Sequence, residues 1–346
     1  MPHHDVRFRC QCGEEHSRDT EYSGMSCSKA WFMQKSTATR AGLKRDMADQ
    51  VLDNIWDILV CAYCGGELQK SSGGAFCSNC SVEYNCTEHG SLDLRLRRPK
   101  ACTLEFNLAS PLLPQDGFKF EPLAFNDKRE IDVANADVPW HLSKELMSYF
   151  PKAKSGNSLV LDLGCGDAIH RKACEKAGFQ WVGLDYASTK APIQGDAHAL
   201  PFKSDAFEFI LSIAVLEHIQ FPFVMMQEAY RVLKPGGRFI GTVAFLEPFH
   251  GDSFYHHTHL GTFNSLQSAG FEIQKVSPSA SWSGLTAQAR MGLFPKMPAL
   301  MSRAIVWPVE VLHKLWWQAG SLVTSRADKN VRVRDTTGAF TFVATK

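Results

Sequence analysis

An apolar strand followed by two closely spaced glycines is the feature that most limits how this chain can fold. Residues 159–163 read LVLDL, the sequence GCG follows at 164–166, and a helical pattern begins near His170. Glycine has no Cβ, so the backbone of such a turn approaches a ligand closely, and the next helix presents unbonded N–H groups at its start. This combination predicts a cofactor site at the end of a buried strand.

The spacing of the glycines excludes a dinucleotide fingerprint. That fingerprint needs a third glycine three residues after Gly166, where this chain has Ile169,. From about residue 136 the pattern alternates between strands and helices, which predicts an α/β fold with a parallel sheet,. We expect strands at 159–163, 181–185, 208–212, 238–243, 271–276 and 339–344.

Beyond the glycine turn, four further pieces of sequence resemble class I S-adenosylmethionine-dependent methyltransferases of the methyltransferase 11 type. They are VGLDYA at 182–187, GDAHALPF at 195–202, FEFILSIAVLEHI at 207–219 and VLKPGGRF at 232–239. The resemblance covers about residues 136–280. It implies a Rossmann-like sheet that is mostly parallel, with the last strand antiparallel.

The resemblance also implies the cofactor, S-adenosylmethionine, and the residues that hold it. These residues are Asp162, Gly164 and Gly166 along the methionine part, Asp185 at the ribose, Asp196 and Ala197 at the adenine, and Ser212 below the sulfur. Asp167 stands where the family has a small residue. The alternatives are that Asp185 is a surface acid at a strand end and that Asp196 caps a turn.

Methyl transfer needs an aligned nucleophile, and a base only when the acceptor must lose a proton. The candidate catalytic residues are Glu217 and His218 in VLEHI, and His256 and His257 in the histidine-rich loop after the fifth expected strand, which also holds His250 and His259. The alternatives are that the Glu-His pair only packs or caps its helix, and that the loop histidines bind a metal.

Four cysteines predict a structural zinc site. Cys61 and Cys64 form one C-x2-C pair, twelve residues follow, and Cys77 and Cys80 form a second pair. Two such pairs place four thiolates around zinc and leave no open position for catalysis. The segment resembles zinc ribbons found beside methyltransferases, and the alternative is disulfides or idle thiols. No metal is expected at Cys10, Cys12 and Cys27.

These observations divide the chain into an N-terminal segment of unclear fold at 1–58, a zinc-ribbon-like domain at 59–98, a linker at 99–135 and a methyltransferase domain at 136–346. The N-terminal segment contains one expected helix, at 41–59. The last domain carries an insertion at about 283–334 that is rich in tryptophan. The insertion is a lid over an apolar acceptor, a peripheral membrane contact through 304–323, or a helical cap or dimer face.

The charge balance gives little support to a nucleic-acid partner, because 37 Lys and Arg stand against 36 Asp and Glu,. The start of the chain lacks the apolar core of a secretory signal and no apolar run is long enough to cross a bilayer, so we expect a cytoplasmic protein without a transmembrane segment,. The oligomeric state is open.

Three functions remain. The first is an enzyme that methylates a small-molecule or lipid-like acceptor. The second is an RNA methyltransferase, acting on tRNA or rRNA, whose zinc ribbon binds the nucleic acid with help from the basic run RLRRPK at 95–100,. The third is a scaffold without catalysis that binds the cofactor and recruits a partner through the ribbon.

Overall fold

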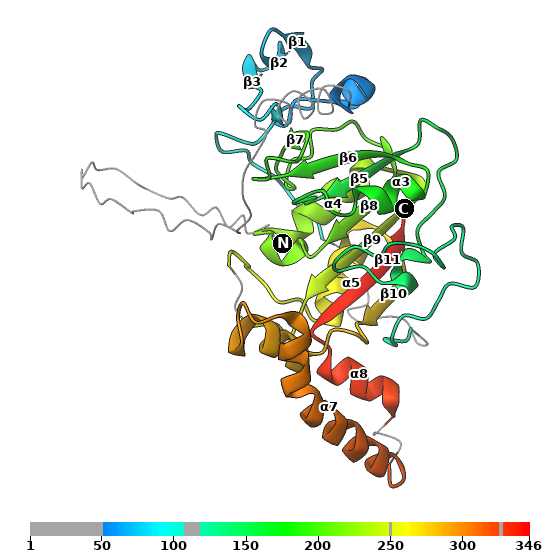
Figure 1. Cartoon of the computed structure of the whole chain (residues 1–346). Helices are drawn as coiled ribbons and strands as arrows, with labels where there is room; N and C mark the ends of the chain where they lie inside the picture. The colour runs from blue at the N-terminus through cyan, green and yellow to red at the C-terminus, as the bar shows by residue number, and fades with distance from the viewer. Residues whose placement is uncertain (1–50, 107–117, 249–250, 325–327) are drawn as a thin grey trace, which may run out of the picture.

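The computed structural model describes residues 51–106, 118–248, 251–324 and 328–346. In these ranges eight strands form one sheet in the order β10-β11-β9-β8-β5-β6-β7-β4, and β1, β2 and β3 form a smaller sheet (Figure 1). The predicted α/β fold with a mostly parallel sheet is confirmed.

The core of the large sheet is parallel and apolar. Its strands are β5 (Leu159–Leu163), β6 (Gln180–Asp185), β7 (Ile193–Gln194), β8 (Phe207–Ile213) and β9 (Leu233–Ala244). The strands β10 (Glu272–Pro278) and β11 (Ala339–Thr345) complete one side, and β11 runs antiparallel to both of its neighbours. All six expected strands are present, and the antiparallel last strand agrees with the resemblance.

Side chains alternate between the two faces of the sheet along each strand, and both faces are buried,. Leu161 and Ile210 belong to one apolar cluster, whereas Val160 and Phe209 belong to a second cluster on the other face. The covering helices are α2 (Lys144–Met147), α3 (Arg171–Lys176), α4 (Pro222–Val232) and α5 (His259–Ala269). Two covered faces explain why the central strands lack the polar alternation of a half-exposed sheet.

The order of the strands fixes where a ligand binds. From β5 the chain proceeds to β6 and β7 on one side of the sheet, and then returns to β8 and β9 on the other. Connections therefore leave the carboxyl ends of β5 and β8 in opposite directions. Sheets of this kind bind ligands in the crevice at that point.

The cysteine-rich segment is joined to the large sheet. The strands β1 (Gln69–Ser71), β2 (Gly74–Cys77) and β3 (Val82–Asn85) pair antiparallel with one another. The next strand, β4 (Leu92–Asp93), leaves this small sheet and pairs in parallel with β7. Buried residues of the small sheet, including Tyr84, belong to the same apolar cluster as Leu161. The domain boundaries themselves stay a prediction.

Only part of the N-terminal expectation falls within the described residues. In the helix expected at 41–59, residues 51–55 are helical and a 3-10 turn, η1 (Trp56–Ile58), follows. The remainder of that helix lies outside the described residues, as do Cys10, Cys12 and Cys27.

The insertion is helical and leaves an apolar surface exposed. It contains α6 (Gly284–Ala287), a π-helix η3 (Gln288–Leu293), α7 (Ala299–Ser321) and α8 (Lys329–Thr336). Figure 1 shows α7 extending away from the large sheet, at the end opposite to β1, β2 and β3. Within the described ranges, no helix combines the length and the apolar character that crossing a bilayer requires.

Candidate active site

The turn after β5 depends on its two glycines for different reasons. Gly164 has φ +76° and donates its N–H to the carbonyl of Leu184 at 2.8 Å. A Cβ at Gly164 would lie 2.4 Å from a methyl group of Val215, so packing excludes any side chain there. Gly166 has φ +48°, and a Cβ there would meet nothing within 4 Å. The turn is therefore closed around Gly164 and has open space above Gly166.

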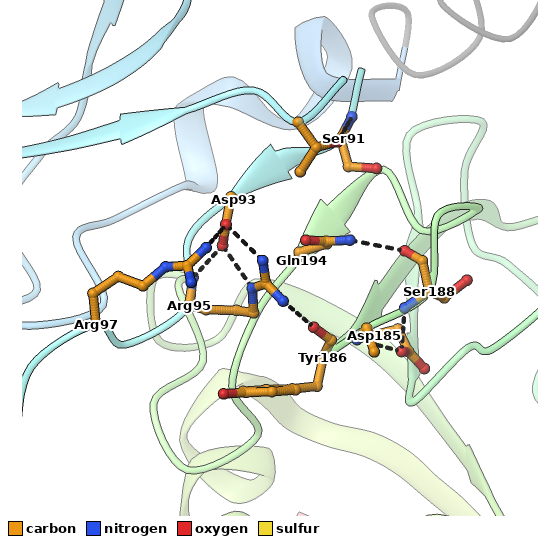
Figure 2. A network of polar contacts seen from close by, with 10 residues as sticks. Ser91, Asp93, Arg95, Arg97, Asp185, Tyr186, Ser188 and Gln194 are labelled. Carbon is orange, nitrogen blue, oxygen red and sulfur yellow. Dashed lines mark hydrogen bonds and ion pairs between the residues drawn. The ribbon is translucent and has the colours of Figure 1, made fainter. Parts of the chain in front are cut away.

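Asp185, at the end of β6, lies against this turn. Its Oδ2 accepts the N–H of Gly166 at 3.0 Å, and its Oδ1 accepts the N–H of Ala187 at 2.9 Å. Oδ1 also accepts the N–H of Ser188 at 2.8 Å (Figure 2). The hydroxyl of Ser188 donates to the carbonyl of Gly166 at 2.6 Å. The carboxylate is thus fixed beside the open glycine, where its Oδ2, which accepts a single N–H, can still accept from a hydroxyl of a ligand,.

Asp162 lies beneath the turn and is buried. Its Oδ2 accepts the indole N–H of Trp181 at 2.9 Å, whereas its Oδ1 has no hydrogen-bond partner among the described residues and lies 4.0 Å from Nδ1 of His170. Burial raises the pKa of Asp162 to about 7, and the charge of Asp185 adds to this, against the hydrogen bond from Trp181. Oδ1 of Asp162 is therefore a buried acceptor that no described residue uses.

Asp196 forms a pair with a histidine that the sequence did not single out. Its Oδ1 accepts the backbone N–H of His198 at 2.9 Å and faces Nδ1 of the same ring at 2.6 Å. The other ring nitrogen accepts the N–H of Phe221 at 3.1 Å, so the proton of a neutral His198 ring lies on Nδ1,. Burial opposes ionisation of Asp196, but the hydrogen bonds from His198 hold its pKa below the usual value. Ala197 lies between the two and is buried.

The end of β8 closes the remaining side of the turn. Ser212 is buried within the strand, two residues before Ala214. Ala214 has φ +55°, a conformation that a residue with a Cβ rarely adopts, and its N–H lies 3.0 Å from the hydroxyl of Thr242,. Strained backbone of this kind is frequent at functional sites. Sequence analysis missed Ala214 because nothing in its residue type signals the conformation.

Glu217 is a second buried acid. It lies in the 3-10 turn η2 (Leu216–His218) and is 1% exposed, and its Oε2 has no hydrogen-bond partner among the described residues. Burial raises the pKa of Glu217 to about 7, and the nearby charge of Glu247 raises it further, against hydrogen bonds from backbone groups. A carboxyl group that titrates near neutral pH is suited to proton transfer.

The candidate histidines fall into two groups. His257 is buried, and its Nε2 lies 3.3 Å from the carbonyl of Leu216, while the carbonyl of Glu217 accepts the N–H of Phe254 at 2.7 Å. These contacts bind the loop after β9 to η2. Burial lowers the pKa of His257 and favours its neutral form. His218 and His256 are exposed.

An aromatic wall, which the sequence did not predict, lies between Asp162 and Glu217. The wall consists of Trp140, Trp282 and Arg290. The guanidinium carbon of Arg290 lies 4.3 Å from the ring centre of Trp140 and 5.2 Å from that of Trp282. Trp282 donates its indole N–H to Glu247 at 2.7 Å, and the carbonyl of Trp140 lies 3.1 Å from Nε2 of His170. The wall therefore reaches from the neighbourhood of Glu217 to that of Asp162.

The four predicted metal ligands come together. Their sulfur atoms all lie within 4.8 Å of one another, with 3.5 Å between Cys61 and Cys80 and 3.5 Å between Cys64 and Cys77. Tetrahedral zinc, with Zn–S bonds of about 2.3 Å, needs sulfurs about 3.8 Å apart. The donor set fits zinc. In the described part of the chain, the histidine-rich loop forms no comparable group.

The structure thus brings the glycine turn, Asp185 and the end of β8 to the crevice at the carboxyl ends of β5 and β8. Two features fit the implied cofactor: the open space above Gly166 and the unpaired Oδ1 of Asp162. The individual roles predicted for the site residues remain predictions.

The central segment is similar to known methyltransferases. Residues 161–241 match the family model described as methyltransferase domain. The chain is 25% identical over 134 residues to a ubiquinone biosynthesis O-methyltransferase of Roseobacter denitrificans, a match that covers 34% of this chain and 53% of that protein. It is 26% identical over 211 residues to (+)-O-methylkolavelool synthase of Herpetosiphon aurantiacus, covering 52% and 73% of the two chains.

The chain therefore spans about half the length of the first of these relatives. Among solved structures, the complex between the Haloferax volcanii Trm112 methyltransferase activator and the putative methyltransferase matches with a TM-score of 0.39 and 17% identity, covering 60% of this chain and 89% of that chain. An S-adenosylmethionine-dependent methyltransferase from Mesorhizobium loti matches with a TM-score of 0.37 and 16% identity, covering 58% and 95%.

The raised pKa of Glu217 predicts how stability depends on pH. The folded protein holds this proton more tightly than the unfolded chain, so ionisation of Glu217 destabilises the fold as pH rises from 5 to 8, by about 2 kcal/mol. Glu217→Gln removes this contribution. Urea unfolding at pH 5 and pH 8 should show the variant gaining about 2 kcal/mol relative to the wild type over that interval. Equal pH dependence of the two proteins would contradict the assignment.

The open space above Gly166 predicts a variant that separates folding from binding. Gly166→Ala should cost about 1 kcal/mol of stability, because only the positive φ is strained. Its Cβ enters the space assigned to the cofactor, so calorimetry should show at least a tenfold loss of affinity for S-adenosylhomocysteine. Gly164→Ala is the matched variant, and its clash with Val215 should reduce stability more. A Gly166→Ala protein that binds as tightly as the wild type would exclude this turn from the site.

Proposed function

From the match of residues 161–241 to a methyltransferase domain model, we propose that this protein transfers a methyl group from S-adenosylmethionine to a small-molecule or lipid-like acceptor. The observation that carries the proposal is the carboxylate of Asp185, held by the N–H of Gly166 beside an open glycine turn. Main-chain groups and an acid in this arrangement suit a ligand with a ribose diol and a cationic amino-acid part.

In this proposal, the chain binds the cofactor at three places. Asp185 accepts from the ribose hydroxyls, Asp196 and Ala197 bind the adenine, and the backbone at Gly164 and Gly166 passes under the methionine part. Asp162 favours the ammonium end through its unpaired Oδ1. When bound, S-adenosylmethionine supplies a methyl group activated by a positive sulfur, so the protein mainly needs to orient the acceptor and exclude water.

Glu217 is our candidate for the group that receives a proton from the acceptor. It is buried near the end of β8, and a pKa of about 7 lets it hold or release a proton at neutral pH,. The proton from the acceptor atom would move to its Oε2, which has no other partner among the described residues. We assign His257 to holding the loop, because its Nε2 is engaged with Leu216. His218 and His256 remain candidates at the exposed rim.

We place the acceptor against the aromatic wall. Trp140 is 50% exposed and faces Arg290, so the wall offers flat apolar area with one positive charge at its centre. An apolar acceptor, or an aromatic one, gains from contact with such a surface. Small net charge and the wall together favour this class of acceptor over RNA.

The exposed surface of α7 supports a lipid-like acceptor reached at a membrane. Its exposed apolar residues are Leu300, Met301, Ile305, Trp307, Val309, Leu312, Leu315 and Trp316. The single carboxylate of α7, Glu310, is turned inward and accepts hydrogen bonds from Ser283 and Thr286 at 2.9 Å and 3.0 Å. Arg303 and Lys314 are exposed. A helix with tryptophans and cations but no outward acid suits the surface of an anionic bilayer.

Labelled transfer tests the proposed activity. The zinc-loaded protein, incubated with cell extract and S-adenosylmethionine labelled in its methyl group, should place label in the small-molecule or lipid fraction. Asp185→Ala should bind the cofactor at least tenfold more weakly, because the ribose acceptor is lost. Label that enters RNA would favour the RNA alternative instead. A protein that binds the cofactor and labels no fraction would favour the scaffold.

Vesicle flotation tests the membrane contact. The protein should float with vesicles that contain phosphatidylglycerol and should bind less at high salt, since the cations of α7 contribute. Trp316→Glu should reduce binding at least tenfold, while Phe125→Glu, a matched change at an exposed ring outside α7, should leave it unchanged. Absence of flotation, or a dimer in solution that Trp316→Glu dissociates, would overturn this contact in favour of a dimer face.

A further inference from the structure

One chain of polar contacts connects the cysteine-rich module to the candidate ribose site. It begins at β4, where the N–H of Leu94 donates to the carbonyl of Gln194 at 2.8 Å and the N–H of Leu92 donates to the carbonyl of Pro192 at 3.0 Å. These bonds fix β4 to the edge of β7, close to the loop that follows Asp185 (Figure 2). Two segments that the sequence analysis assigned to different domains therefore share one sheet.

Asp93, the last residue of β4, anchors two arginines. Arg95 donates from Nε to Oδ1 at 2.8 Å and from Nη2 to Oδ2 at 2.7 Å, which is a bidentate pair. Arg97 also donates to Oδ2. The Asp93 side chain is only 11% exposed, and although burial alone would raise its pKa, the hydrogen bonds from Arg95 and Arg97 hold that pKa below the usual value. The carboxylate stays ionised and orients Arg95.

Arg95 uses its remaining nitrogen on the other side of the junction. Its Nη1 donates to the carbonyl of Tyr186 at 3.0 Å, and its guanidinium carbon lies 5.5 Å from the centre of the Tyr186 ring. Tyr186 directly follows Asp185, and Ser188 is held from a second direction by Gln194, whose Nε2 lies 3.3 Å from the Ser188 carbonyl. Figure 2 shows these side chains converging on the loop 186–188.

The same segment is bound to the first cysteine pair. Tyr63, which lies between Cys61 and Cys64, accepts the N–H groups of Arg97 at 2.5 Å and Arg98 at 2.8 Å on its hydroxyl. Lys100 donates to the carbonyl of Ala62 at 2.6 Å. A change in the conformation of the Cys61–Cys64 pair would therefore move the segment 97–100, which directly follows Arg95.

We propose that Arg95 is a positioning residue that couples the four-cysteine module to cofactor binding, by holding the Tyr186 carbonyl and hence the turn in which Asp185 presents its carboxylate. This inference rests on the proposed function, because it takes Asp185 as the ribose acceptor. Arg95 itself touches no reacting atom. Loss of its contact frees the loop whose N–H groups, at Ala187 and Ser188, hold Oδ1 of Asp185, so cofactor affinity falls while the rate of transfer at saturation is retained.

The test compares two arginines that share Asp93. Arg95→Ala removes the contact to Tyr186, whereas the control, Arg97→Ala, removes a contact to Asp93 and leaves Tyr186 untouched. Calorimetry with S-adenosylhomocysteine should show a loss of affinity of about tenfold for Arg95→Ala and less than twofold for Arg97→Ala. Zinc content should equal that of the wild type in both. In the labelled transfer, Arg95→Ala should raise KM for the cofactor with kcat within twofold.

A second arm uses the metal. Chelation of zinc should weaken binding of S-adenosylhomocysteine to the wild type, and should weaken it much less in Arg95→Ala, because the coupling is already broken. The inference would be overturned if chelation weakened S-adenosylhomocysteine binding equally in the wild type and in Arg95→Ala, or if Arg95→Ala bound it as tightly as the wild type. In either case, binding by the wild type would still support the cofactor site. Should Arg95→Ala fold poorly, Arg95→Lys provides the same comparison, since a lysine cannot bind Asp93 in bidentate fashion and reach Tyr186 together.

Discussion

The fold of this protein depends on one backbone junction, the turn that leaves β5 and closes on the end of β6. The N–H of Gly164 bonds to the Leu184 carbonyl, and the N–H of Gly166 bonds to the Asp185 carboxylate. Both bonds are made between groups of the chain itself, so they fix the shape of the turn. Packing of Val215 against Gly164 then ties the end of β8 to the same point. The ends of β5, β6 and β8 therefore meet at one crevice.

The two additions to the sheet act on opposite sides of this crevice. The cysteine-rich module joins the β7 edge through β4, and its buried residues belong to the apolar cluster of the large sheet. Trp282, directly before the insertion, and Arg290 within it form part of the aromatic wall, and α7 then extends away from the sheet (Figure 1). In our proposals, the cysteine-rich module affects the binding of the cofactor, and the insertion contacts the acceptor.

The sequence sufficed for features that local patterns encode. The six expected strands followed from apolar runs, and the C-x2-C spacing predicted the cysteine cluster, because both signals lie within a few residues. The contact between Arg95 and Tyr186 joins positions 91 residues apart, and the wall of Trp140 and Trp282 joins distant loops. Such contacts depend on tertiary packing, so no local pattern of apolar residues predicts them. The φ of Ala214 was equally hidden, since alanine is an ordinary residue for a strand end.

The most direct test of this account is calorimetric titration of the wild-type, zinc-loaded protein with S-adenosylhomocysteine, with NAD as a comparison ligand. A crevice built from Gly166 and Asp185 predicts saturable one-to-one binding of S-adenosylhomocysteine and none of NAD, because the chain lacks the third glycine of the dinucleotide turn,. Absence of heat with S-adenosylhomocysteine at protein concentrations of about 100 μM, or tighter binding of NAD, would contradict the claim that this turn is a methyl-donor site.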